Sequence, residues 1–187
     1  MEKIKQKIKD LFTRNPRFDL IDLDNIDVTE DPVRPELSVE FRLSNGKRIL
    51  GLKDEAGDTA AIICIAFTND VPATVEEMAL MSHDAYNQSI LRGGLVGNIA
   101  IAYTVWAKKK GGGRAIVNEV YKMVKKSNHL NRLVTLSPLT DMARNFHIKN
   151  GAKELQVNET TQNFEYDISL EDWETALVKA KGFLKVR

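Results

Sequence analysis

A basic, glycine-rich segment is the first part of the sequence with residue types suited to chemistry, because it joins a predicted strand to a predicted helix. The N–H groups in the first turn of a helix lack internal acceptors and lie at the positive end of the helix dipole, so they can bind phosphate oxygens. The consecutive glycines match neither a Walker loop nor a dinucleotide-binding fingerprint. A solvated basic turn is the alternative interpretation. The segment consists of Lys108, Lys109, Lys110, Gly111, Gly112, Gly113, Arg114 and Ala115.

Two further side chains are candidates for nucleophilic or acid–base chemistry. Ser137 precedes a proline at the end of a predicted strand, where it is either a catalytic hydroxyl or simply the point at which proline stops the strand. His147 lies in a predicted helix, and an imidazole with an ordinary pKa near ~6.5 can donate or accept a proton at neutral pH. Spacing alone favours a strand end for Ser137 and a surface or core role for His147.

Alternating strands and helices must position these residues. Residues 37–43 alternate apolar and polar side chains, which predicts a strand with one buried face, and Asn45-Gly46 predicts a hairpin turn into a strand at 49–52. The apolar run 59–68 predicts a central strand covered on both faces. The other predicted elements are helices at about 1–16, 76–89, 114–126 and 140–149 and one bearing Trp173, Leu177 and Ala180, and strands at about 98–107, 132–136, 154–158 and 162–168.

Composition restricts the compartment and the partners. The 187 residues fit one domain, and 27 basic against 26 acidic residues leave a formal charge of +1, which gives no overall field for a nucleic acid or an anionic membrane. No apolar stretch is long enough to span a membrane. The single cysteine, Cys64, lies in an apolar run and suits a reducing cytoplasm. We therefore expect a cytoplasmic protein. His83 and His129 lack partners at metal-ligand spacing, so we expect no bound metal.

The glycine-rich segment resembles the (Gln/Arg)-x-x-Gly-x-(Gly/Ala) motif of GNAT acyltransferases, with Lys110, Gly113 and Ala115 at the three defined positions. The resemblance implies that this loop binds the pyrophosphate of coenzyme A. It also implies that the pantetheine arm and thioester enter where strands 98–107 and 132–136 splay apart. Val105 and Trp106, on the first of these strands, are the corresponding candidates for contact with the coenzyme.

Residues 59–168 are similar to the catalytic domain of malonyl-CoA decarboxylases, a family with the GNAT fold. The strand at 61–68 resembles the family's apolar strand ending in Ala-Leu-Thr, and 132–138 resembles its Phe-Ser-Thr-Leu-Ser-Pro signature. Residues 145–152 resemble Phe-His-Leu-x-Asn-Gly-Ala, and 163–167 resemble Asn-Tyr-x-Tyr-Asp. The resemblance implies catalytic roles for Ser137 and His147, with Tyr166 as a weaker candidate.

These patterns together predict an α/β (α+β) protein with a mixed, mostly antiparallel sheet flanked by helices. We expect a single acyl-CoA-binding domain over 1–187, with residues 98–152 as the core of the coenzyme A site. The resemblance implies conversion of malonyl-CoA to acetyl-CoA and carbon dioxide, with the coenzyme A thioester as substrate and no tightly bound cofactor. An acyl-CoA-dependent N-acyltransferase and a non-catalytic acyl-CoA sensor are the alternatives, and exposed strand edges leave a homodimer open.

Overall fold

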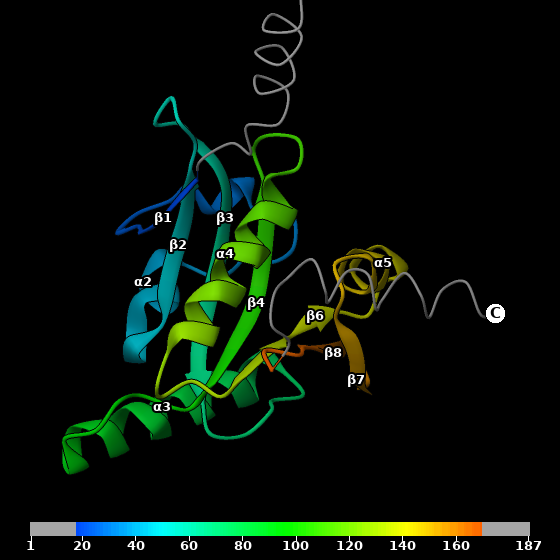
Figure 1. Ribbon diagram of the computed structural model, residues 1–187. Helices are drawn as coiled ribbons and strands as arrows, with labels where there is room; N and C mark the ends of the chain where they lie inside the picture. Colours follow the sequence, from blue (N-terminus) through cyan, green and yellow to red (C-terminus); the bar gives the residue numbers. More distant parts are fainter. Residues whose placement is uncertain (1–17, 170–187) are drawn as a thin grey trace, which may run out of the picture.

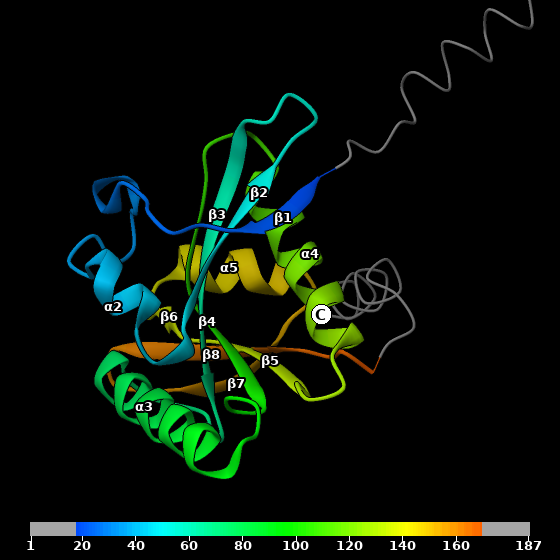
Figure 2. The same ribbon diagram turned by 90° about the vertical axis from the view of Figure 1, so that its left-hand side faces the viewer.

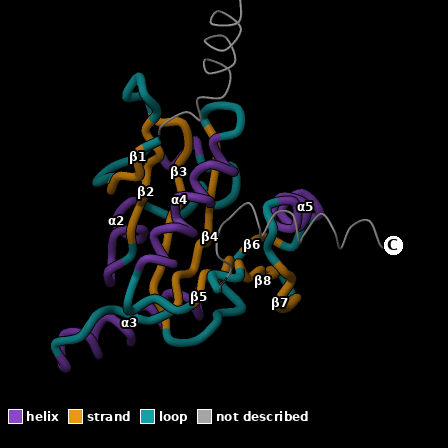
Figure 3. The backbone as a smooth tube through the Cα atoms, in the orientation of Figure 1, coloured by secondary structure: helices purple, strands orange, loops and turns teal. Residues whose placement is uncertain are grey.

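The computed structural model describes residues 18–169, so the predicted N-terminal helix and the helix bearing Trp173 lie outside the described residues. Within this range the strands form one mixed sheet in the order β1-β2-β3-β4-β5-β8-β6, with β7 paired to β8 (Figures 1 and 3). Every pairing is antiparallel except β4 with β5. The predicted mixed, mostly antiparallel sheet is therefore confirmed.

The bounds of the elements follow. The strands are β1 (Asp19–Asp22), β2 (Arg48–Lys53), β3 (Thr59–Thr68), β4 (Ile99–Ala107), β5 (Arg132–Thr135), β6 (Ser137–Pro138), β7 (Lys153–Val157) and β8 (Thr161–Tyr166). The helices are α2 (Val39–Leu43), α3 (Val75–Arg92), α4 (Gly112–Lys126) and α5 (Asp141–Lys149), and short 3-10 turns are η1 (Val28–Glu30) and η2 (Ser44–Gly46).

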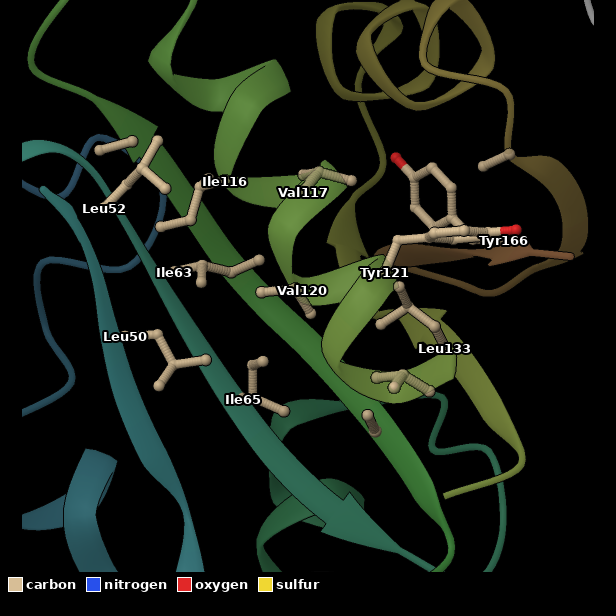
Figure 4. Close-up of a cluster of buried hydrophobic side chains, with 14 of the residues drawn as sticks. Leu50, Leu52, Ile63, Ile65, Ile116, Val117, Val120, Tyr121, Leu133 and Tyr166 are labelled. Carbon is tan, nitrogen blue, oxygen red and sulfur yellow. The ribbon is translucent and has the colours of Figure 1, made fainter. Parts of the chain in front are cut away.

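The central strand β3 is covered on both faces, as its unbroken apolar sequence predicts. On one face Ile63 and Ile65 pack in a cluster with Val117 and Val120 of α4 (Figure 4). On the other face the alternate residues of β3, including Cys64, pack with residues of the 23–41 region and of α3. Figure 2 shows α4 on one side of β2 and β3 and α2 on the other. The core thus fixes β4, the neighbour of β3, between two packed layers.

The predicted strand at 37–43 and its hairpin are wrong, because this segment forms α2 and the turn η2. The side chain of Ser38 caps α2 by accepting a hydrogen bond from the N–H of Phe41, which favours a helix start over a strand. Arg42, assigned by the alternating pattern to the wet face, is fully buried. Asn45 does adopt a positive φ of 55°, but within η2 and not in a two-residue hairpin.

A buried ion pair fastens the segment containing α2 to the sheet. Nη1 of Arg42 lies 2.8 Å from Oδ2 of Asp31, and neither side chain is exposed to solvent. The Asp31 carboxylate also accepts hydrogen bonds from the Thr104 hydroxyl of β4 at 2.8 and 2.9 Å. The Arg42 guanidinium donates further bonds to the carbonyl oxygens of Leu37 and Arg34. Burial of both charges is tolerated because each is paired and hydrogen-bonded.

Candidate active site

Strands β4 and β5 separate partway along their length. Their parallel pairing runs from Ile99 with Arg132 to Ala102 with Thr135 and then ends. A register shift in the β3–β4 pairing at this level marks an irregularity in β4 beside Tyr103. Where the pairing ends, Nε of Arg34 donates to the Tyr103 carbonyl at 3.0 Å, and Nη2 of Arg34 donates to the Leu136 carbonyl at 3.2 Å. One guanidinium therefore holds the backbones of the two diverging segments at a fixed separation.

A cavity of about 370 Å³ lies at this separation, bounded by β4, β5, α4 and α5. Val105 and Trp106 of β4 line it, as does Gly113 at the start of α4. Most of the remaining lining is apolar, and among the described residues no lysine, arginine, aspartate or glutamate contributes to it. Trp106 also packs in the apolar cluster that contains Cys64. The Arg42 guanidinium lies 5.9 Å from the centre of the Trp106 ring. The site is a neutral, largely apolar chamber.

The catalytic candidates converge on one wall of this chamber. Oγ of Ser137 lies 2.9 Å from Nε2 of His147, and Nδ1 of His147 lies 3.0 Å from the hydroxyl oxygen of Tyr166. All three residues line the cavity, and all are at most 5% exposed. Three side chains from the separate elements β6, α5 and β8 thus form one hydrogen-bonded chain.

Local structure places each member of this chain. Ser137 and Pro138 do not end the sheet as proline would suggest, because they pair with β8 as the short strand β6. Helix α5 begins at a Thr140 side chain that accepts from the N–H of Ala143, and one face of the helix carries His147 into the cavity. The His147 ring also stacks on Phe164 with ring centres 5.1 Å apart. Packing and hydrogen bonds therefore fix the orientation of the imidazole.

Burial decides the protonation state of His147. Removal of the imidazole from water disfavours its charged form and lowers the pKa of His147 to about 3, so the ring is neutral at pH 7. Burial likewise raises the pKa of the Tyr166 hydroxyl well above its ordinary value, so this group stays un-ionised. A neutral imidazole beside a hydroxyl can act as a base, which the protonated form cannot.

The depressed pKa of His147 makes stability depend on pH. Between about pH 6.5 and pH 3 the unfolded chain binds a proton at this residue and the folded chain does not, so the free energy of unfolding decreases as the pH falls. We expect a loss of about 2 kcal/mol between pH 6.5 and pH 5 from this residue alone. Urea unfolding of the wild type and of His147→Gln at both pH values measures it. Equal pH dependence in the two proteins would contradict the assignment.

The glycine-rich segment forms the turn from β4 into α4. Gly111 caps the helix with a φ of 82°, a left-handed conformation that glycine favours. A Cβ on Gly112 would lie 2.4 Å from the carbonyl oxygen of Ala60, so only glycine lets α4 begin this close to β3. The N–H groups of Gly113 and Arg114 donate to no acceptor among the described residues. The helix start therefore presents free donors beside the cavity.

The cations of this segment differ in their surroundings. Lys108 and Lys109 are paired with acidic residues of η1 and of the turn between β2 and β3. Lys110 and Arg114 are exposed and form no ion pair within residues 18–169, so they are the cations available to an anion. The pairs are Lys108 with Glu30 (2.5 Å), Lys109 with Asp54 (2.5 Å) and Lys109 with Asp58 (2.8 Å).

Sequence reasoning missed three residues that organise the site. Arg34 holds β4 and the segment after β5 apart, Asp31 anchors Thr104 of β4, and Thr135 bonds to Ser137 at 3.1 Å. The alternation of a strand could have placed Thr135 beside Ser137, two residues away on the same side. Arg34 and Asp31 lie in an irregular segment whose sequence carries no periodic signal.

Neither a metal centre nor a membrane span is found in the described part of the chain. No group of three or more histidine, cysteine, aspartate or glutamate side chains in residues 18–169 is arranged to hold a metal ion. In the same range, no helix combines the length and the apolar character needed to cross a bilayer. His83 is exposed, and Nε2 of His129 lies 2.9 and 2.8 Å from the carbonyl oxygens of Val96 and Gly97.

Comparison with known proteins identifies the fold. No family model and no curated protein sequence matches the chain. The malonyl-CoA decarboxylase of Agrobacterium vitis superposes with a TM-score of 0.64 at 14% identity over 94% of this chain and 66% of that one. The malonyl-CoA decarboxylase of Cupriavidus metallidurans superposes with a TM-score of 0.60 at 14% identity over 96% of this chain and 68% of that one. The loading GNATL domain of CurA from Lyngbya majuscula superposes with a TM-score of 0.53 at 14% identity over 82% of this chain and 98% of that domain.

These structures differ in how much of their own length is matched. This chain spans about two thirds of the two decarboxylases and nearly all of the GNATL domain. At 14% identity the likeness establishes the arrangement of strands and helices and leaves the reaction to be argued from the site. The protein has the GNAT fold, and its strands and helices are arranged like those of the matched parts of the two malonyl-CoA decarboxylases.

Proposed function

We propose that this protein is an acyl-CoA-utilising enzyme that converts malonyl-CoA to acetyl-CoA and carbon dioxide. The observation that carries the proposal is the Ser137–His147–Tyr166 chain in the wall of an apolar cavity where β4 and β5 separate. The malonyl-CoA decarboxylases that share the fold support the choice of reaction.

The neutral lining of the cavity suits decarboxylation. As the carbon–carbon bond breaks, its electrons move into the thioester to give an enolate, and the negative charge leaves the carboxylate as neutral carbon dioxide departs. A carboxylate held where no lysine or arginine among residues 18–169 lines the wall gains little stabilisation, so charge migration out of it is less costly. A cationic wall would instead stabilise the malonyl ground state.

The hydroxyl and the imidazole have separate tasks in this scheme. Ser137 lies at the cavity wall and can hydrogen-bond to the substrate carboxylate before it leaves. The α-carbon then takes a proton from the hydrogen-bonded chain of Ser137, His147 and Tyr166, and water returns a proton to this chain after acetyl-CoA leaves. All three residues are at most 5% exposed, so the chain that supplies this proton lies in the cavity wall and has little contact with bulk water.

Incubation of the protein with malonyl-CoA alone tests the proposed function. Mass spectrometry should show acetyl-CoA formed by the wild type and by His83→Ala, whose histidine is exposed on α3. Ser137→Ala and His147→Ala should form little acetyl-CoA. Intact malonyl-CoA after incubation with the wild type, under conditions where coenzyme A binding is measured, would overturn the proposal.

Transfer of an acyl group to an amine is the second candidate. The specific observation in its favour is the neutral state of His147, whose burial keeps a proton acceptor in the cavity at pH 7. An amine must lose a proton as it attacks a thioester, and a neutral imidazole can take it. Release of free thiol from acetyl-CoA only in the presence of an added amine would favour this reaction over decarboxylation.

The glycine-rich turn should bind the pyrophosphate through the N–H groups and the cations that have no partner within residues 18–169. We expect Lys110→Ala and Arg114→Ala each to raise the KM for malonyl-CoA about three- to tenfold, because each removes one charge-assisted contact. Lys109→Ala is the matched control and should change the KM less, since Lys109 is paired with Asp54 and Asp58. Steady-state kinetics at two salt concentrations measures this, and equal effects of all three substitutions would contradict it.

A further inference from the structure

The hydroxyl of Thr135 determines the direction of the hydrogen bonds around Ser137. Among the described residues, Oγ1 of Thr135 has two partners, the backbone N–H of Phe164 at 3.1 Å and Oγ of Ser137 at 3.1 Å. The N–H of Phe164 can only donate. The remaining bond joins two hydroxyls, either of which can donate, and Thr135 is only 1% exposed. The Thr135 proton is therefore satisfied only if it is donated to Ser137.

This direction fixes the tautomer of His147. If Oγ of Ser137 accepts from Thr135, its own proton points to the other partner, Nε2 of His147 at 2.9 Å. Nε2 is then the unprotonated nitrogen of the neutral ring. Nδ1 carries the proton and donates it to the hydroxyl oxygen of Tyr166 at 3.0 Å. In the opposite tautomer Ser137 donates to Thr135, and the buried Thr135 proton has no acceptor within residues 18–169.

The arrangement is that of an activated nucleophile. A hydroxyl donates to a base, and a third group orients that base, which is the geometry that lets serine attack an acyl carbon. Ser137 lies in the wall of the cavity to which the proposed function assigns the acyl group of the coenzyme A thioester. We propose that Ser137 is a nucleophile that accepts the acyl group of an acyl-CoA, and that the protein hydrolyses acyl-CoA thioesters through an acyl-serine. This inference rests on acyl-CoA binding in the cavity, as the proposed function requires, and does not require decarboxylation.

The two half-reactions balance without a further reagent. Oγ of Ser137 bonds to the thioester carbon as its proton moves to Nε2 of His147, and the carbon–sulfur bond then breaks as the thiolate of coenzyme A takes that proton. An acyl ester on Ser137 and free coenzyme A result. Water then attacks the ester carbon and gives its proton to Nε2, and the departing Ser137 oxygen takes it back. The products are a carboxylic acid and the free enzyme.

Acetyl-CoA is the substrate to test, because it has no carboxylate to lose. We expect a burst of free thiol equal to the enzyme concentration, followed by slower release, and a peptide containing Ser137 that carries one acetyl group after acid quenching. Ser137→Ala should lack the modified peptide and lose the burst by at least about 100-fold in rate. The same burst in Ser137→Ala, or no acetylated peptide at any quench time while acetyl-CoA binding is measured, would overturn the proposal.

Two further variants separate chemistry from folding. Ser137→Cys keeps a nucleophile and should accumulate a stable acetyl thioester, so it reports on the site even if the alanine variant folds poorly. Thr135→Val removes the proton donated to Ser137 and should slow the burst at unchanged KM. Thr135→Ser keeps a hydroxyl and should restore the rate. A purely structural role of Thr135 would not give this pair of results. Ser89→Ala, whose hydroxyl bonds to the Tyr86 carbonyl on α3, is the matched control and should retain the full burst.

The outcomes for this inference and for the proposed function are distinguishable. An acetylated Ser137 in a protein that leaves malonyl-CoA intact would support the nucleophile and overturn decarboxylation. Acetyl-CoA formed from malonyl-CoA by a protein that never acquires an acetyl group on Ser137 would support decarboxylation and overturn the nucleophile.

Discussion

Replacement of His147 by glutamine should lower kcat for malonyl-CoA decarboxylation by about 10²–10⁴-fold, with little change in KM, because positioned proton transfer contributes a factor of this size. Glutamine is uncharged and can hydrogen-bond to Ser137, but it cannot exchange a proton with substrate or hydroxyl. Since His147 is neutral in the folded protein, the substitution does not change the charge of the cavity at pH 7. A loss of kcat therefore reports on proton transfer and not on electrostatics.

Steady-state kinetics with acetyl-CoA detected by mass spectrometry measures this effect. His83→Gln is the matched control, because it makes the same chemical change on the exposed surface of α3 and should leave kcat unchanged. A variant at position 147 that retained more than about a tenth of the wild-type kcat would show that His147 does not take part in the rate-limiting proton transfer.

The sequence was informative wherever a pattern extended over a whole buried element. The apolar runs at β3 and β4 indicate central strands, and the helical period of α4 indicates which of its faces is buried, because long elements have many residues that must agree. The order of β4, the glycine-rich turn and α4 follows from the same signals. The chemistry at Ser137 and His147 was predicted from family resemblance, and their spacing of ten residues does not by itself reveal a contact.

The sequence was misleading where burial depends on a partner outside the local element. The alternation at 37–43 is that of a strand, yet Ser38 caps a helix there and Arg42 is buried against Asp31, eleven residues away. A buried arginine looks the same in sequence as an exposed one. The role of Arg34, which reaches carbonyl oxygens at Tyr103 and Leu136, could not be predicted for the same reason. Such contacts depend on tertiary structure, which local propensity does not encode.

Removal of one member of the Asp31–Arg42 pair should cost about 3–5 kcal/mol of unfolding free energy, because the remaining charge would stay buried without its partner. Asp31→Asn and Arg42→Met each leave such a charge. The double variant should lose less than the sum of the two single changes, since neither charge of this pair then stays buried without its partner. Urea unfolding of the four proteins at pH 7 gives the coupling between the two residues.

The exposed pair Arg48–Asp22 provides the matched control, because it has a similar N–O distance of 2.7 Å but side chains 39% and 60% exposed. Arg48→Met should cost only about 0–1 kcal/mol, since water stabilises the carboxylate left behind. A comparable loss at both pairs would show that burial does not set the cost.

Because Asp31 also accepts hydrogen bonds from Thr104, which lines the cavity, Asp31→Asn should reduce turnover as well as stability, whereas Arg48→Met should reduce neither substantially. The buried pair thus links the segment that sequence patterns misassigned to the strand that bounds the proposed active site.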